Sequence, residues 1–153
     1  MQRNLDSIAS IKALVGQPAT VSEPLMLTQS MINQFADTTQ DWQWIHVDTD
    51  RAAGESPYGT TIAHGLLTLA LIPAWFHRCF SISNQRLSLN YGFDKVRFLA
   101  PVPHGSNLIG GFQLARAEDV GPDEVRCVWQ VEVRIGGADK LVMVATWLTQ
   151  LRY

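Results

Sequence analysis

Cysteine is scarce in this chain, which has only two, Cys79 and Cys127, among 153 residues. They lie far apart and form no C-x-x-C motif, so the sequence does not indicate a disulfide framework. Proteins without disulfides are typical of a reducing compartment. We therefore expect a cytoplasmic protein.

The chain also lacks an excess of charge of either sign. Twelve Lys and Arg residues stand against 14 Asp and Glu residues, which gives a formal net charge of -2, and no basic run stands out. Such a balance offers no general attraction to nucleic acid or to an anionic membrane surface, so we expect neither as a partner. The start of the chain has no apolar segment typical of a secretory signal. The longest apolar candidate, residues 62–76, is interrupted by His64, Gly65 and Pro73 and is too short to span a bilayer.

Several motifs of nucleotide and nucleophile chemistry are missing. The sequence contains no G-x-S-x-G, no phosphate-binding glycine loop, no G-x-G-x-x-G and no cysteine nucleophile motif. His46, Asp48, Asp50 and His64 lie close together in the sequence, but their spacing matches neither H-E-x-x-H nor a calcium-binding loop. We therefore expect no metal and no cofactor. Asp48 and Asp50 are better explained as the start of a short helix.

Hydrophobic residues make up 46% of the chain, enough for the core of one domain, which we expect to span residues 1–153. Helical periodicity predicts helices over 6–15 and 28–37, and an apolar central helix over 64–80 that Pro73 should kink or interrupt. Alternation of apolar and polar residues predicts antiparallel strands, joined by short connections and a turn at Gly136-Gly137. The expected strands cover residues 86–98, 105–118, 125–135 and 141–151, with an irregular or edge strand at 18–27. Gly92 and Gly110-Gly111 each suggest a bulge or bend, and residues 38–61 are expected to form a long polar loop. The fold class is α+β, with one sheet wrapped around one apolar helix.

Two polar groups stand out within that loop. Asp41 and His46 lie five residues apart, and a carboxylate and an imidazole can together bind and activate one water. Trp42 and Trp44 are expected to shield the turn between them from solvent. The alternative is that Asp41 caps a helical turn and His46 is an ordinary loop histidine.

A second segment, residues 56–65, runs into the central helix. The free N–H groups at a helix start point outward and stabilise developing negative charge on an oxygen. Gly65 has no side chain to block the approach of such an oxygen. The alternative is an ordinary helix start, in which His64 caps or packs. His77 and His104 are expected at the surface.

These segments together resemble the MaoC-like dehydratase family, which includes (R)-specific enoyl-CoA hydratases. The family motif is roughly D-x-N-P-x-H-x-D; Asp41, His46 and Asp48 match it, whereas Gln43 and Trp44 replace Asn and Pro. The sequence Ala63-His64-Gly65 matches the entry to the family's central helix, and residues 98–102 match its F-x-x-P-V strand segment.

The resemblance implies a hot-dog fold in a homodimer, with Asp41 and His46 as the catalytic pair and the Gly65 N–H holding a thioester carbonyl. The implied reaction is reversible (R)-specific hydration of a trans-2-enoyl-CoA. Further substrate contacts are expected from Tyr58, Gly59, His64 and Asn90, and the CoA phosphates would need cations such as Arg78, Arg86, Lys95 and Arg97. A small hydroxyl residue that some members carry in the central helix falls at Ala70 here, and Thr68 is expected on another face.

Two other functions stay open at this point. A hot-dog thioesterase would use the same helix start but add water at the carbonyl carbon. A non-catalytic acyl-CoA binder would need only the cavity. The Asp41 and His46 pair argues against both. Thioesterases of this fold commonly place a single carboxylate elsewhere, and a binder has no need of two groups around one water.

Overall fold

The computed structural model describes residues 2–153, and its central feature is one antiparallel sheet with the order β2-β6-β7-β8-β5. The long strands are β5 (Leu87–Phe98), β6 (Asn107–Gly121), β7 (Glu124–Ile135) and β8 (Lys140–Arg152). The two-residue strands β2 (Thr20–Val21) and β3 (Leu25–Met26) both pair with β6 and form the far edge. A separate parallel pair joins β1 (Arg3–Leu5) to β4 (Phe80–Ile82). The predicted α+β class and antiparallel pairing are confirmed.

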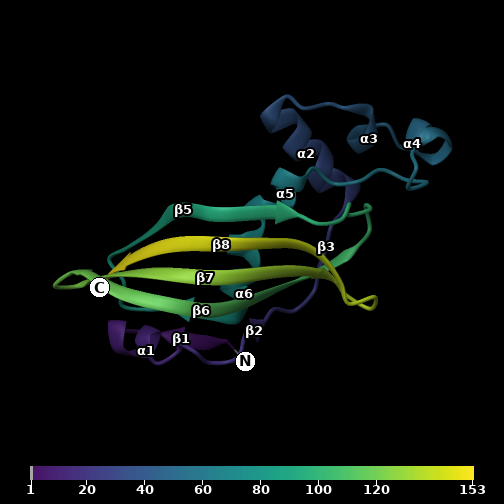
Figure 1. Cartoon of the computed structure of the whole chain (residues 1–153). Helices are drawn as coiled ribbons and strands as arrows, with labels where there is room; N and C mark the ends of the chain where they lie inside the picture. Colours follow the sequence, from purple (N-terminus) through teal and green to yellow (C-terminus); the bar gives the residue numbers. More distant parts are fainter. Residues whose placement is uncertain (1) are drawn as a thin grey trace.

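The helices divide into three groups (Figure 1). α1 (Ile8–Lys12), capped by Ser7, lies beside β1 near one edge of the sheet. α2 (Gln29–Thr39), α3 (Trp44–Val47) and α4 (Thr49–Glu55) gather beyond one end of the sheet, whereas α5 (Gly65–Ala70) and α6 (Ile72–Cys79) run along its face. No helix in residues 2–153 is long and apolar enough to cross a membrane; α2, the longest, has 11 residues.

The core lies between α6 and the sheet, and aromatic rings fill it. Phe76 of α6 meets Phe112, Trp129 and Trp147 of three neighbouring strands edge-on, with ring centroids 5.1 to 5.4 Å apart. Edge-to-face contact is a favourable arrangement for aromatic pairs. The rings fix α6 against the sheet, and with it the position of α5.

The expected central helix is present but divided. α5 ends at Ala70, Leu71 joins the two segments, and Pro73 occupies the first turn of α6. Proline lacks the N–H that a continuous helix needs and fits a helix start well, which explains the break. The apolar residues do not all face the core either, since Leu66 is 61% exposed.

Two other expectations need correction. The segment 38–61 is not one long loop, because it contains α3, which was not expected, as well as α4. The short helix predicted at Asp48 and Asp50 is confirmed as α4, which Asp48 caps through a bond from the Arg51 N–H. The bulge expected at Gly92 is present, but the pairing of β6 with β7 continues without interruption through Gly110 and Gly111. Gly110 is instead a packing site, since a Cβ built there would lie 2.7 Å from the Cβ of Trp75.

Gly110→Ala should therefore lower the free energy of unfolding by about 1–3 kcal/mol, the usual cost of overpacking a core. Gly111→Ala is a matched control in the same strand, because its new Cβ would make only an ordinary contact at 3.8 Å. We expect the control to change stability by less than about 0.5 kcal/mol. Urea unfolding of the three proteins measures both values, and equal effects of the two substitutions would contradict this account of Gly110.

Candidate active site

Asp41 is positioned by the end of α2. Gln40 ends that helix in the left-handed conformation with φ 60, and the Asp41 N–H then bonds back to the Ala36 carbonyl at 3.2 Å. This reversal satisfies a helix-end carbonyl and sends the chain sharply out of the helix. The Asp41 side chain is 55% exposed. The alternative interpretation, in which Asp41 caps a helical turn, is therefore wrong. Asp41 is the first residue beyond Gln40, the C-cap of α2.

His46 lies in the single helical turn of α3. The His46 N–H bonds to the Gln43 carbonyl and the Asp48 N–H to the Trp44 carbonyl, at 2.9 and 3.0 Å. This turn supplies the tight connection between Asp41 and His46 that the family's proline would otherwise favour. The expected solvent shield is only partial, because Trp42 is 56% exposed and its indole donates to Asp37.

The His46 ring is held in one orientation by the backbone. Its Nδ1 lies 2.7 Å from the Ile62 carbonyl oxygen. Because a carbonyl can only accept, Nδ1 must carry the hydrogen. Nε2 of the neutral ring is then an acceptor with no hydrogen-bond partner in the described part of the chain. Burial lowers the pKa of His46, with a smaller contribution from His64, and these outweigh the bond to Ile62 and the nearby Asp41, which raise it. The neutral ring is therefore favoured near pH 7.

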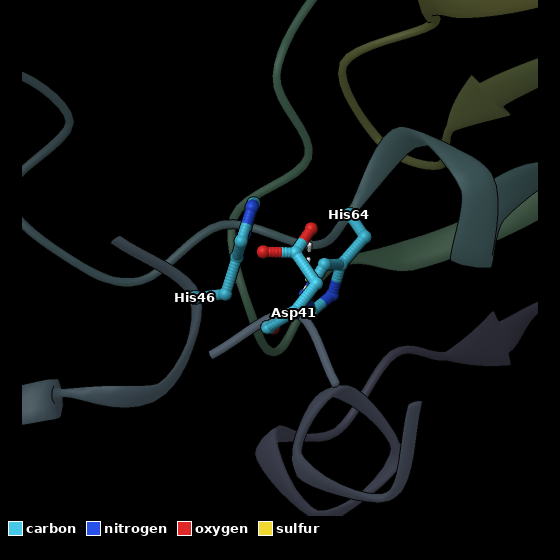
Figure 2. A group of neighbouring side chains, drawn as sticks. All are labelled: Asp41, His46 and His64. Atoms are coloured by element: carbon cyan, nitrogen blue, oxygen red, sulfur yellow. Dashed lines mark hydrogen bonds and ion pairs between the residues drawn. The ribbon is translucent and has the colours of Figure 1, made fainter. Parts of the chain in front are cut away.

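His64 comes from a third segment and completes the cluster (Figure 2). Asp41, His46 and His64 each offer one polar atom, and these atoms lie within 4.8 Å of one another. Two groups this close can both reach one water at ordinary hydrogen-bond distances of about 2.6–3.2 Å. The His46 and His64 rings are stacked, with centroids 3.8 Å apart and planes 27° apart. An imidazole pair and a carboxylate this close together are also a set of groups that could hold one metal ion.

A cavity of about 370 Å³ opens beside this cluster. Its walls include His46, Tyr58 and Gly65. The Gly65 N–H donates to no acceptor within residues 2–153, so it is available to a ligand. The ring of Phe98 lies over Gly65, where a Cβ would come within 3.0 Å of it. Most of the other lining residues are apolar, namely Ile62, Ala63, Leu99, Ala100, Pro101, Val102 and Val142.

Of the residues expected to contact substrate, some line this cavity and others do not. Tyr58 is 45% exposed and lines the cavity, whereas Gly59 has φ 68 and shapes the turn beside it without lining it. Asn90 lies elsewhere: its side chain accepts a bond from the Trp147 indole at 2.7 Å and lines a different cavity. Among the expected cations, the guanidinium of Arg78 donates to the Pro24 carbonyl. His77 and His104 are exposed, as predicted.

The sequence did not predict a role in the site for two residues, Gln29 and Thr68. Gln29 at the start of α2 donates to the His46 carbonyl at 2.7 Å and accepts from Thr61, so it ties α2 to both parts of the site. No local pattern marks such a residue, because its partners lie far away in the sequence. Thr68 does lie on another face than Ala70, which is exposed, but its face is the one that lines the cavity with Gly65, and its buried hydroxyl has no partner among the described residues. Its spacing of three residues from Gly65 was the available signal.

Comparison with known proteins decides the family. The family described as MaoC like domain matches residues 10–134. The chain belongs to this family. It is 43% identical over 143 residues to the 3-hydroxyacyl-thioester dehydratase Z of Mycobacterium tuberculosis, with 94% of each chain covered. It is 40% identical over 148 residues to nodulation protein N of Rhizobium leguminosarum bv. viciae, with 96% of this chain and 92% of the relative covered.

Solved structures of the family share the fold of this MaoC-like protein. The unliganded (R)-hydratase PhaJ1 from Pseudomonas aeruginosa superposes with a TM-score of 0.68, at 23% identity, over 87% of this chain and 80% of that chain. The hot-dog fold expected from the sequence is thereby confirmed. Family membership and the dehydratase relative also identify the MaoC-like protein as an enzyme, a hydro-lyase.

The lowered pKa of His46 predicts a pH dependence of stability. Its folded pKa lies below the ordinary value of 6.5, so on acidification the unfolded chain takes up a proton at His46 before the folded protein does. The stability contributed by this neutral ring is complete above about pH 6.5 and is lost as the pH falls toward the folded pKa. Between pH 7 and pH 5, the free energy of unfolding of wild type should therefore fall more steeply than that of His46→Gln. Urea titrations at several pH values measure both slopes, and a steeper slope in the variant would contradict the assignment.

Proposed function

We propose that this MaoC-like protein hydrates trans-2-enoyl thioesters reversibly to (R)-3-hydroxyacyl thioesters. One observation carries the proposal: polar atoms of Asp41 and His46 lie within 4.8 Å of each other, and His46 lines a cavity together with Gly65, whose N–H has no acceptor among the described residues. Hydration needs these two functions together, a pair that binds water and a donor for the thioester oxygen. The 3-hydroxyacyl-thioester dehydratase relative supports the same reaction, because dehydration is its reverse.

In the proposed mechanism, Asp41 and His46 hold one water beside C3 of the substrate. The free Nε2 of His46 accepts a hydrogen bond from this water, and its orientation follows from the Nδ1–H bond to Ile62. The water oxygen bonds to C3 while its proton moves to the Asp41 carboxylate. The electron pair of the double bond shifts onto the thioester carbonyl oxygen. As the carbonyl re-forms, the proton that the pair took from water passes to C2, which regenerates the Asp41 carboxylate.

Gly65 is the proposed donor for the carbonyl oxygen as it gains negative charge. α5 is only six residues long, so this role rests on the free N–H itself rather than on a long helix. A donor aimed at an oxygen that gains charge stabilises the transition state more than the ground state. The acyl chain is proposed to lie in the apolar part of the cavity, with Tyr58 at its side. The carrier is proposed to be CoA, whose phosphates would meet exposed cations such as Lys95 and Arg97.

We further propose that the chain works in the cytoplasm as one domain paired in a homodimer. β5 supports this assembly, because within residues 2–153 it is an edge strand that pairs only with β8. Leu87, Leu89 and Tyr91 on this strand are 44 to 56% exposed. An unpaired edge with exposed apolar side chains is normally covered in solution.

Substitution of the pair tests the mechanism. Asp41→Asn removes the proposed base and His46→Gln removes the ring that orients the water. Each should lower kcat/KM for crotonyl-CoA and for a longer trans-2-enoyl-CoA by about 10²–10⁴-fold, the usual contribution of a general acid or base. Loss of the enoyl-thioester absorbance measures the rate. Asp50→Asn is the matched control, because it makes the same change from carboxylate to amide at an exposed position of α4. This variant should retain full activity.

Other outcomes would redirect the assignment. Release of free thiol without hydration would identify a thioesterase, and binding of enoyl-CoA without either reaction would identify an acyl-CoA binder. Wild-type hydration that persists in Asp41→Asn and His46→Gln would leave the reaction in place and refute the roles given to these two residues.

A further inference from the structure

His64 is buried among the groups of the site yet is neither a water-binding group nor a cap in the mechanism above. Only 4% of the residue is exposed, although a free histidine is strongly hydrated. It stands at the N-cap position of α5, but its side chain makes no capping hydrogen bond. A residue at this position ordinarily uses its side chain to satisfy the first N–H groups of the helix. The His64 ring points elsewhere.

The ring lies between two other rings. The Phe35 ring of α2 lies 5.1 Å from it between centroids, and the His46 ring is stacked on it at 3.8 Å. Contacts from α2 and α3 therefore fix the plane of His64. Because aromatic groups at these separations leave little room for rotation, the two ring nitrogens have defined surroundings.

Those surroundings define one tautomer. Nε2 lies 3.0 Å from the backbone carbonyl oxygen of Asp41 and 3.9 Å from its carboxylate. A carbonyl oxygen only accepts, so Nε2 carries the hydrogen and donates it. Nδ1 is buried and has no hydrogen-bond partner among the described residues, which fits a bare nitrogen better than a second N–H.

We propose that His64 is a positioning residue that sets Asp41 in register with His46 and Gly65. The inference rests on the proposed hydration reaction. His64 is bonded covalently to Gly65, its Nε2–H holds the Asp41 backbone, and its face supports the His46 ring. One side chain thus joins the water-binding pair to the N–H that receives the thioester oxygen. Its contact with Asp41 is to the backbone, so it acts on the placement of that residue rather than on the reacting atoms.

Two substitutions separate the contacts of His64. His64→Phe keeps a flat ring in the stack but removes the bond to the Asp41 carbonyl. His64→Gln removes the ring but keeps an N–H donor at a similar distance from the backbone. We expect His64→Phe to lower kcat by about 10–100-fold with KM changed less than about 3-fold, because misplacement of about 1 Å is enough for such a loss. His64→Gln should recover a large part of the lost kcat. The control is His77→Phe on the exposed face of α6, which should keep wild-type activity.

A double-mutant cycle distinguishes positioning from a general loss of structure. If His64 acts through Asp41, His64→Phe should lower the residual rate of Asp41→Asn by less than about 2-fold, because the group it positions is already disabled. A fully additive loss, or a His64→Phe enzyme with wild-type kcat, would overturn the proposal. A KM increase that accounts for the whole loss would overturn it as well.

The placement can also be tested without turnover, so that failure of the proposed function does not decide this inference. In the ¹⁵N spectrum of histidine-labelled wild type at neutral pH, His64 should show a protonated Nε2 and a bare Nδ1. His46 should show the opposite pattern, with the hydrogen on Nδ1. A His64 ring with the hydrogen on Nδ1 would overturn the proposal even if the enzyme hydrates enoyl thioesters. The expected spectrum in an enzyme without hydratase activity would leave the placement standing and refute the reaction.

Discussion

The site depends on a short extended segment, residues 61–64, that joins the helical group at the end of the sheet to the sheet itself. Ile62 exchanges bonds with α3 at both of its backbone groups: its N–H donates to the Ile45 carbonyl at 3.1 Å, and its carbonyl accepts from His46 Nδ1 at 2.7 Å. The next N–H, of Ala63, donates to Val102 at 2.8 Å, just beyond β5. His64 and Gly65 follow directly. Four consecutive residues therefore fix the His46 tautomer, the His64 ring and the free N–H relative to one another.

The hydrogen bonds of residues 61–64 explain how a site can form between helices as short as α3 and α5. α3 has four residues and α5 has six, and helices this short have little stability of their own. Backbone hydrogen bonds to the extended segment and the Gln29 amide at the start of α2 compensate for this. The rigid base is the aromatic contact of α6 with three strands, which fixes the segment from its other end.

Much of the fold follows from local sequence signals. Alternation of apolar residues over the last three strands, the turn at Gly136-Gly137 and the Thr28 cap of α2 need only neighbouring residues, and each was predictable. The break at Leu71 was also indicated by Pro73. Gly110 was misinterpreted because its role depends on Trp75, which approaches from a distant helix. Sequence alone records that a glycine is present, not whether backbone freedom or space is required there.

The candidate site, like the fold, was predictable from sequence only where local motifs mark its residues. The motif carrying Asp41 and His46 was visible in the sequence, and so was the glycine at the start of α5. The roles of Gln29, Thr68 and the His64 ring depend on contacts between segments that the sequence does not place side by side. Trp44 stands where the family motif has proline. Only the folded chain shows that Asp41 and His46 still come together without it, because the turn of α3 brings their polar atoms within 4.8 Å of each other.

The most direct test of the account is the position of the oxygen that water contributes. Wild-type enzyme would be incubated with crotonyl-CoA in ¹⁸O-labelled water, and the product analysed by mass spectrometry and chiral chromatography. We expect an intact thioester with the label on C3 and the (R) configuration, because in the proposed mechanism Asp41 and His46 hold water beside C3 while Gly65 receives the carbonyl oxygen. Label in a free carboxylic acid, or the (S) product, would contradict it.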